Sequence, residues 1–191
     1  MKSIGITGGI GSGKSMVCKI LEVLGYPVFY ADQEAKKSMV QDNLLKEQII
    51  SLLGSDSYQD KELNRPFIAE KIFGNTDLKH KMDQLVHPAV FRSFESWKSK
   101  QTSPFIFNES ALLFETGSYK RFNATVLVTA DKETRIERVM KRDGVTRDQV
   151  ISRMENQLSD AEKQKLCTCQ IVNNPEMMLI PQVLEMLEFL K

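Results

Sequence analysis

The residues with the clearest chemical meaning lie near the N-terminus of the 191-residue chain, in the stretch Gly8-Gly9-Ile10-Gly11-Ser12-Gly13-Lys14-Ser15. The stretch fits the pattern G-x-x-x-x-G-K-[ST] at every fixed position. Its glycines allow consecutive backbone N–H groups to form a concave anion site, because no Cβ obstructs the turn. In such loops the lysine reaches the β- and γ-phosphates of a nucleotide, and the hydroxyl after it binds Mg²⁺. The pattern therefore predicts that Lys14 and Ser15 bind a nucleoside triphosphate and its magnesium ion.

The segments around this loop support the same interpretation. Ile4-Gly5-Ile6 predicts a short buried strand before it, and apolar residues at helical spacing from Val17 to Leu24 predict a helix after it, which Gly25 ends. The helix begins at the loop, so its positive dipole end faces the same phosphates. Residues 26–30 predict a second strand, which completes a strand–helix–strand unit of a parallel sheet. The alternative, a glycine-rich turn with a chance lysine, explains neither flanking element.

An aspartate directly after the second strand is the candidate catalytic base. Ala31-Asp32 stands at the carboxyl end of that strand, and this edge of an open α/β sheet is where ligands bind. Phosphoryl transfer to an alcohol needs a group that accepts the proton of the attacking hydroxyl, and a carboxylate facing the γ-phosphate does this. The alternative role of Asp32 is to cap a helix that starts at Gln33. The two roles are compatible.

Five arginines follow a fourth strand, predicted at 125–129. Arginine suits phosphate oxygens because its guanidinium is bidentate and always charged, so a hinged helical segment that carries arginines could close over ATP. The alternative is a solvated helix face, since Glu137 and Asp143 are interleaved with them. We expect at least one of the arginines to bind phosphate. The five are Arg135, Arg138, Arg142, Arg147 and Arg153, and the first three share one helical face.

The block between residues 33 and 100 shows helical patterns and no strand pattern, and it is longer than a crossover requires. We interpret it as an inserted substrate-binding cap. Pro88 should break or kink its last helix near His87, and His87 is either a structural hydrogen-bonding residue or a substrate ligand; we favour the ligand. The predicted helices span 33–40, 42–53, 65–73 and 76–100, the third with Asn64 as its cap.

Strand patterns return after this block. The strand at 104–108 leads into Glu109, which is either an acid near the metal or a surface acid. Phe105, Phe107, Phe114 and Phe122 are interpreted as core residues. Further strands are predicted at 125–129 and 171–172, and further helices at 131–142, 146–158 and 177–190.

Composition excludes several classes of protein. The net charge of +1 argues against binding to a nucleic-acid backbone or an anionic membrane, and no apolar run approaches the ~20 residues of a membrane span. Cys18, Cys167 and Cys169 form no disulfide framework and indicate a reducing compartment, so we expect a cytoplasmic protein. One domain with an insertion fits the length, and we expect a monomer or a weak homo-oligomer.

Taken in order, several segments resemble the dephospho-CoA kinase family. The loop at 5–15, Ala31-Asp32, Leu85-Val86-His87-Pro88-Ala89-Val90 and Leu112-Leu113-Phe114-Glu115 are similar to motifs of that family. The loop alone is unspecific, whereas the His-Pro and Leu-Leu-Phe-Glu segments together are specific. The match continues in order with Arg138-Val139-Met140-Lys141-Arg142-Asp143, Arg153, Gln157 and Asn173, so that the resemblance covers essentially the whole chain.

This resemblance implies a reaction and a fold. The reaction is transfer of the γ-phosphate of ATP to the ribose 3′-hydroxyl of dephospho-CoA, the last step of coenzyme A synthesis. The fold is that of α/β P-loop kinases, with a five-stranded parallel sheet of order 2-3-1-4-5 flanked by helices. Residues 1–32 and 101–191 would form the nucleotide-binding core, 138–160 a helical lid, and 33–100 a helical CoA-binding insertion.

The resemblance also implies roles for individual residues. Asp32 would be the base, with Lys14 and Arg142 stabilising phosphate and Ser15 binding Mg²⁺. Dephospho-CoA would lie towards Asp32, Arg65, His87, Leu113 and Glu115. The nucleotide would be bound by Gly9, Gly11, Ser12, Gly13, Lys14, Ser15, Met16, Arg138, Arg142 and Asn173, with Asn173 near adenine.

Four positions depart from the family pattern. Tyr30 stands where an aspartate is usual, so a metal role of that carboxylate is lost or moved. Met16 replaces a common threonine and removes a hydroxyl contact to the α-phosphate, while Ala111 replaces a proline and Thr168 an acid. Lys14, Ser15 and Asp32 are retained, so activity is expected.

Two other functions compete with this one. Another small-molecule kinase, such as a nucleoside monophosphate or shikimate kinase, fits the loop but not the long insert and the His-Pro segment. A nucleotide-dependent switch or assembly ATPase also uses such a loop, but the chain has no guanine-reading Asn-Lys-x-Asp segment.

Overall fold

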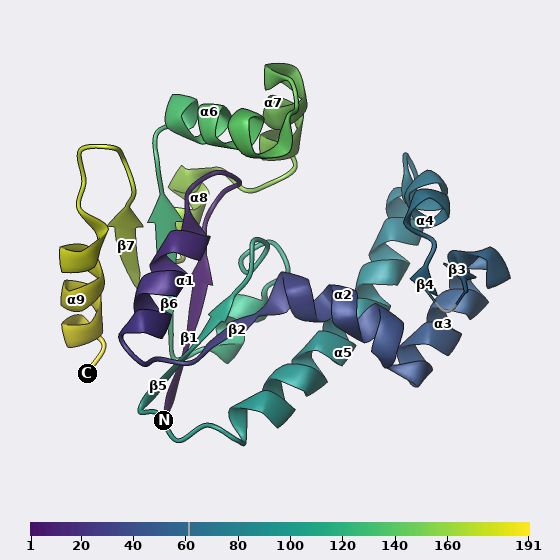
Figure 1. Cartoon of the computed structure of the whole chain (residues 1–191), viewed down its shortest axis with the longest axis horizontal. Helices are drawn as coiled ribbons and strands as arrows, with labels where there is room; N and C mark the ends of the chain where they lie inside the picture. Colours follow the sequence, from purple (N-terminus) through teal and green to yellow (C-terminus); the bar gives the residue numbers. More distant parts are fainter. Residues whose placement is uncertain (61) are drawn as a thin grey trace. The chain divides into compact units, whose positions relative to one another are not determined.

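The computed structural model describes residues 1–60 and 62–191, and the chain divides into two compact units. The first, which we name the core unit, comprises residues 1–30 and 101–191; the second, the helical unit, comprises residues 31–100. The boundary follows Tyr30, so Asp32 belongs to the helical unit. Figure 1 shows that the helical unit is an insertion between two strands of the core unit.

A five-stranded parallel sheet forms the centre of the core unit (Figure 1). Its order is β2-β5-β1-β6-β7, which is 2-3-1-4-5 among the strands of this sheet and confirms the expected order. Ile4 of the central strand pairs with Phe107 on one side and Ala124 on the other, and these strands are buried. The strands are β1 (Lys2–Thr7), β2 (Val28–Tyr30), β5 (Phe105–Glu109), β6 (Ala124–Thr129) and β7 (Cys169–Val172).

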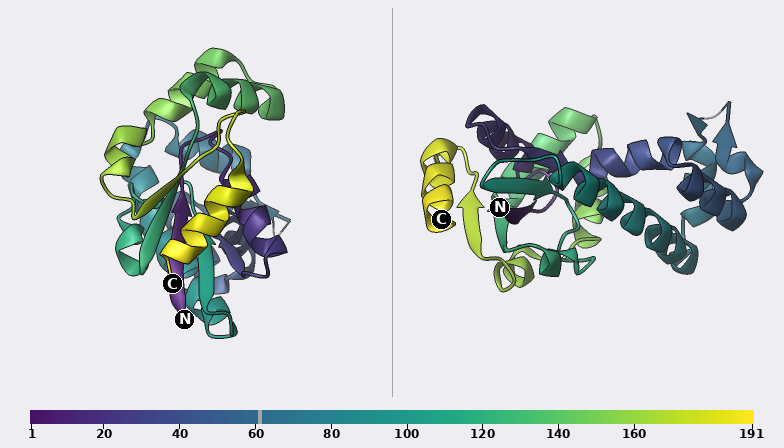
Figure 2. Two further views of the ribbon diagram at one scale, coloured as in Figure 1. Left: turned by 90° about the vertical axis from the view of Figure 1, so that its left-hand side faces the viewer. Right: turned by 90° about the horizontal axis from the view of Figure 1, so that it is seen from below.

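Several helices of the core unit, among them the first and the last, contact strands of this sheet. The first and last pack against each other, and both contribute to the main apolar cluster with Ile4, Phe107 and Val126; Figure 2 shows the last helix running alongside β7. Phe105 and Phe114 are buried and Phe122 is half-buried. The helices are α1 (Lys14–Val23), α6 (Lys132–Asp143), α7 (Arg147–Glu155), α8 (Asp160–Gln164) and α9 (Leu179–Phe189), with a 3₁₀ turn at Ser118–Arg121.

The helical unit has an apolar cluster of its own, built around Leu45, Ile49, Ile68 and Met82. Side chains cap three of its helices, because Asp42, Asn64 and Asn75 each accept a hydrogen bond from a backbone N–H in the following turn. The elements are α2 (Ala31–Gln41), α3 (Asn43–Leu53), a 3₁₀ turn (Ser55–Ser57), β3 (Tyr58–Gln59), β4 (Glu62–Leu63), α4 (Arg65–Ile72) and α5 (Thr76–Lys98).

Two expectations for the helical unit are wrong. Pro88 does not break α5, which is continuous over Thr76–Lys98; the alternative that Pro88 kinks the helix stays a prediction. Proline removes one backbone hydrogen bond, but Val86 and Ala89 on either side are buried in the same apolar cluster and keep both halves in place. The block is also not purely helical, because Tyr58 pairs with Leu63 in a short antiparallel ladder. Strands this short carry too few residues to show an alternating pattern.

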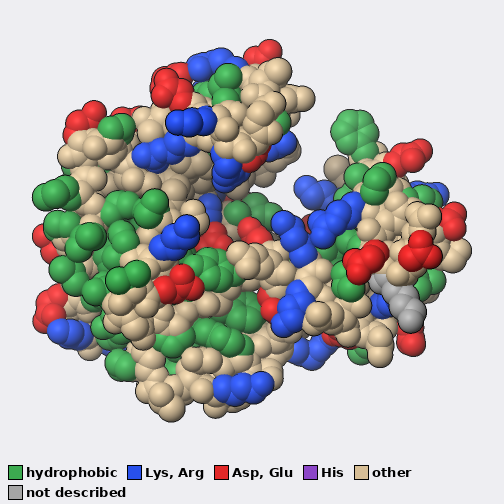
Figure 3. Space-filling model, in the orientation of Figure 1, with side chains coloured by type: hydrophobic (Ala, Val, Ile, Leu, Met, Phe, Trp, Pro, Cys, Tyr) green, Lys and Arg blue, Asp and Glu red, His purple; other side chains and the backbone are tan. Residues whose placement is uncertain are grey.

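The surface is mixed in charge. Figure 3 shows both Lys and Arg side chains and Asp and Glu side chains on the visible face. Within the described residues, no helix has both the length and the apolar character needed to cross a bilayer.

Candidate active site

The glycine-rich loop connects β1 to α1 at the carboxyl edge of the sheet. Gly11 and Gly13 have φ values of 79° and 89°, in the left-handed region that favours glycine. The loop folds onto itself, with Ser12 N–H donating to the Gly9 carbonyl at 3.1 Å, and Gly13 precedes the first turn of α1. The backbone therefore has the curled shape that presents N–H groups and a helix N-terminus to an anion.

Two glycines of the loop leave room for side chains from distant segments. A Cβ on Gly9 would lie 2.1 Å from Nη2 of Arg135, and a Cβ on Gly13 would lie 2.0 Å from Nδ2 of Asn173. A side chain at either position would have to displace Arg135 or Asn173. Close approach therefore favours glycine at both positions, and at Gly13 the positive φ favours it as well.

Lys14 lies across the loop that precedes it. Its Nζ donates to the carbonyl oxygen of Gly8 at 2.9 Å, which keeps the ammonium beside the curled backbone. Ser15 and Met16 are exposed in the first turn of α1, and the Ser12 side chain is fully buried beneath the loop. The arrangement places the cation and the Ser15 hydroxyl at the same end of α1.

Asn173 and Arg138 flank the loop at Gly13. Asn173, just after β7, donates from Nδ2 to the carbonyl of Ser12 at 2.8 Å. Nη1 of Arg138 lies 3.8 Å from the position of a Cβ on Gly13, and this nitrogen is buried without a hydrogen-bond partner among the described residues. A buried guanidinium nitrogen without a partner is costly, so this position favours an anionic ligand.

The other two arginines on the predicted helical face have different surroundings. Arg142 donates from Nε and Nη2 to the two carboxylate oxygens of Asp143 at 2.7 and 3.1 Å. These hydrogen bonds, joined by one from Arg153, hold the pKa of the Asp143 carboxyl below its usual range. Arg142 must exchange this partner before it can bind phosphate. Arg135 is buried and contacts the loop itself rather than facing a ligand.

The Leu-Leu-Phe-Glu segment is fixed within the core unit. Leu113 is buried and packs over Gly5, where a Cβ would meet it at 2.6 Å. Glu115 lies 2.9 Å from Nζ of Lys163, a fully buried lysine of α8, and accepts a hydrogen bond from the N–H of Leu158 at 3.1 Å. The sequence did not identify Lys163 as a partner, because 48 positions separate it from Glu115.

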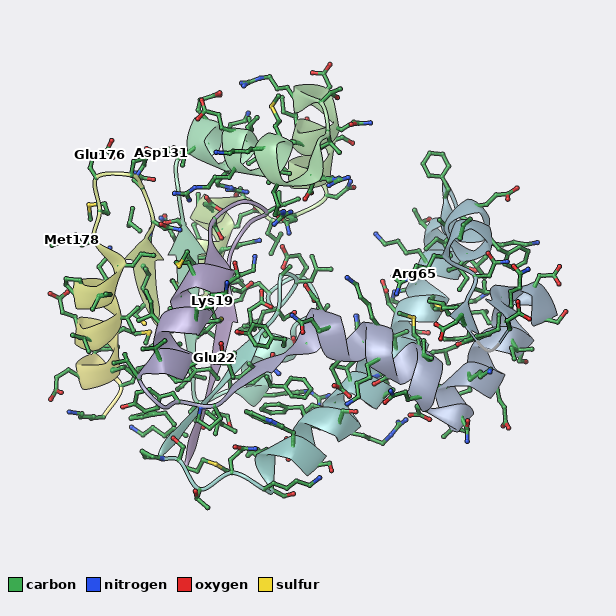
Figure 4. The ribbon with its side chains drawn as sticks, in the orientation of Figure 1. Lys19, Glu22, Arg65, Asp131, Glu176 and Met178 are labelled. Atoms are coloured by element: carbon green, nitrogen blue, oxygen red, sulfur yellow. The ribbon has the colours of Figure 1, made fainter. Side chains whose placement is uncertain are left out.

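Three expected site residues belong to the helical unit, and all three are exposed there. Asp32 lies inside the first turn of α2, which begins at Ala31, so the alternative that it caps a helix starting at Gln33 is wrong. Arg65, labelled in Figure 4, is the first residue of α4. His87 lies in the middle of α5, directly before Pro88.

Tyr30 stands where the family pattern has an aspartate, and its surroundings show what this position can supply. Burial raises the pKa of the Tyr30 hydroxyl, so this position supplies no negative charge near neutral pH. Glu109, next to it in the sheet register, retains a carboxylate at the same edge.

Burial also raises the pKa of the thiols of Cys18, Cys167 and Cys169, the last to about 11. All three therefore stay protonated at neutral pH and are poor nucleophiles.

Comparisons with known proteins agree over almost the whole chain. A family model described as dephospho-CoA kinase matches residues 2–178. A dephospho-CoA kinase of Bacteroides fragilis (strain YCH46) is 38% identical over 188 residues, which covers 98% of this chain and 92% of that protein. A dephospho-CoA kinase of Salinibacter ruber is 40% identical over 166 residues, covering 85% and 83%.

Solved structures resemble this fold as well. The crystal structure of a protein from Thermus thermophilus has a TM-score of 0.88 and 33% identity, covering 98% of this chain and 96% of that one. Shikimate kinase from Acinetobacter baumannii has a TM-score of 0.59 at 13% identity, covering 100% and 93%, which is a likeness of fold alone. The similarity in sequence and the similarity in fold thus extend over the same residues.

Proposed function

The chain belongs to the dephospho-CoA kinase family and is an ATP-dependent phosphotransferase, and we propose that it moves the γ-phosphate of ATP to the ribose 3′-hydroxyl of dephospho-CoA, giving coenzyme A and ADP. The phosphotransfer part of this proposal rests on the curled loop at residues 8–15, with Lys14 across it and the N-terminus of α1 beneath it, and the acceptor rests on membership of the family. Catalysis of phosphoryl transfer depends on positioning and on cations at the transferred group, and this loop supplies both.

The nucleotide lies along the loop in this proposal. Lys14 moves from the Gly8 carbonyl to the β- and γ-oxygens. The other loop residues that contact the phosphates are Gly9, Gly11, Ser12, Gly13, Ser15 and Met16. Arg138 donates a hydrogen bond from its unpaired Nη1 to an oxygen of the nucleotide. Asn173, already bonded to the Ser12 carbonyl, borders the adenine.

Two residues act on the transfer itself. Asp32 accepts the proton of the attacking 3′-hydroxyl, which requires a carboxylate within hydrogen-bond reach of that hydroxyl. Arg142 leaves Asp143 and binds the transferred group, where a bidentate guanidinium stabilises charge on the equatorial oxygens. The segment 138–160 would act as the lid that brings Arg142 to the nucleotide.

The acceptor is assigned to the helical insertion at 33–100 together with Asp32. Arg65 is an exposed cation at the start of α4 and suits a phosphate group of dephospho-CoA. His87 is exposed on α5, so a ligand can reach its ring. From the core unit, Glu115 and the buried Leu113 border the acceptor, with Lys163 and Gly5 fixing that segment.

Magnesium fits the donor set at the loop. The Ser15 hydroxyl is an exposed oxygen ligand, and Glu109 offers a carboxylate at the same sheet edge. No three His, Cys, Asp or Glu side chains form a metal-binding group within residues 1–60 and 62–191, and Mg²⁺ usually takes few protein ligands and completes its shell with phosphates and water. When bound, the ion neutralises charge on the β- and γ-phosphates.

We also propose a cytoplasmic location and a monomeric or weakly self-associating protein without a nucleic-acid partner. All three cysteines are free thiols, in keeping with a reducing compartment. The mixed surface charge and the net charge of +1 provide no strong field for polyanions.

A coupled ADP-release assay tests the proposed reaction. ATP is supplied alone, with dephospho-CoA, with shikimate, or with AMP, at saturating Mg²⁺. We expect ADP formation only with dephospho-CoA. Release that does not depend on an acceptor would instead support a switch or ATPase, and release stimulated by shikimate or AMP would support another small-molecule kinase.

A further inference from the structure

One residue at the apex of the phosphate loop is held by side chains from far along the chain. The backbone N–H of Ile10 donates to Oε1 of Gln157 at 2.9 Å, and its carbonyl accepts from Nε of Arg135 at 2.9 Å. The backbone N–H and the backbone carbonyl of Ile10 are therefore both hydrogen-bonded to side chains, 147 and 125 positions away. Ile10 has glycines on both sides, so its own neighbours provide little conformational restraint.

Arg135 is itself fixed in several directions. The residue is only 8% exposed, and Nη1 donates to Asp160 at 2.9 Å. Nη2 occupies the space that a Cβ on Gly9 would fill, and the Arg135 carbonyl lies where a Cβ on Gly11 would meet it at 2.5 Å. A guanidinium placed this way cannot turn towards a nucleotide without releasing the loop.

The side chain of Ile10 is held as well. It packs on an apolar cluster formed by α6 and α7, centred on Ile136, Val139 and Val150. The same segment thus contacts the backbone N–H, the backbone carbonyl and the side chain of one loop residue. Movement of this segment would therefore change the conformation of the loop at Ile10.

We propose that Gln157 and Arg135 are positioning residues that keep the phosphate loop in its binding conformation through Ile10. This proposal rests on the proposed function of the loop in ATP binding. When the clamp is lost, the loop samples conformations in which its N–H groups no longer converge, and apparent affinity for the triphosphate falls with the fraction of competent loop. Affinity for the acceptor does not depend on this equilibrium.

Gln157→Leu tests the clamp, because leucine fills similar space but offers no acceptor to the Ile10 N–H. An unmade hydrogen bond at this half-buried position should raise the KM for ATP about tenfold. The KM for dephospho-CoA should stay within about twofold. A purely structural role would lower the active fraction and hence kcat, without moving one KM alone. Gln157→Ala serves the same test if the leucine variant does not fold.

Gln164→Leu is the matched control. Gln164 lies on α8, is exposed, and donates to Gln170 rather than to the loop, so both KM values should match wild type. An unchanged KM for ATP in the Gln157 variant, or equal changes in both KM values, would overturn the clamp. Absence of dephospho-CoA-dependent ADP release by the wild-type enzyme would instead overturn the proposed function.

Discussion

Replacing Lys163 with methionine removes the cation from a buried ion pair while keeping most of the side-chain volume. Lys163 is fully buried, and its Nζ lies 2.9 Å from Oε1 of Glu115, whose side chain is 16% exposed. That carboxylate also accepts from the Leu158 N–H, and its second oxygen is buried without a hydrogen-bond partner among the described residues. After Lys163→Met, one backbone N–H would be the main compensation for the negative charge.

The structure sets the size of the expected loss. Removing one partner of a buried ion pair costs about 3–5 kcal/mol, because the other charge stays buried without compensation. The remaining N–H of Leu158 and the partial exposure of Glu115 place the expected cost at the lower end, about 3 kcal/mol. For a chain of this length, that corresponds to a fall in Tm of roughly 6–12 °C.

Thermal unfolding followed by circular dichroism measures this loss. The double variant Glu115→Gln/Lys163→Met removes both charges and should recover at least half of it, because no buried charge is left alone. Lys81→Met is the matched control, since Lys81 pairs with Asp77 on an exposed helix face and should change Tm by about 2 °C or less. A Lys163→Met protein that melts within about 2 °C of wild type would refute the reasoning.

Three further predictions concern catalysis and pH. Lys14→Ala should lower turnover roughly 10²-fold in the ADP-release assay, because a cation at the transferred phosphate is lost; near-normal turnover would contradict the assigned role. Asp32→Asn should bind ATP normally by calorimetry but turn over far more slowly, whereas normal turnover with early melting would assign Asp32 to helix stability alone. The N–H of Leu45, and then Arg92, lower the pKa of Asp42, so its carboxylate stabilises the fold above the unfolded-state pKa and loses that effect as pH falls through the lower folded-state pKa. Asp42→Asn should therefore lower the free energy of unfolding by about 1 kcal/mol or less near neutral pH, and the difference from wild type should disappear below about pH 4. Thermal melts of both proteins over this pH range measure the difference, and a difference in Tm that does not depend on pH would contradict the prediction.

Much of the architecture follows from short-range features of the sequence. The loop at 8–15 is identifiable because its chemistry uses backbone N–H groups, a lysine and a hydroxyl that are adjacent in the chain. The strand order 2-3-1-4-5 follows from the family resemblance, and the helices of the 33–100 block follow from apolar spacing and caps such as Asn64. The loop and the helices depend on residues within one or two turns of each other, so no tertiary information is needed to predict them, whereas the strand order was predicted only through the resemblance.

The roles of individual charged residues depend on the tertiary structure. Arg135, Arg138 and Arg142 have equivalent spacing on one predicted helix, yet the first clamps the loop, the second has an unpaired nitrogen beside Gly13, and the third binds Asp143. Periodicity gives the face of a helix, but the environment of each position along that face is set by segments that fold against it. The ion pair of Glu115 with Lys163, and the hold of Gln157 on Ile10, are likewise decided by packing between residues 48 and 147 positions apart. Two polar side chains so far apart in the sequence pair with each other only after folding buries them, because water otherwise takes the place of the partner.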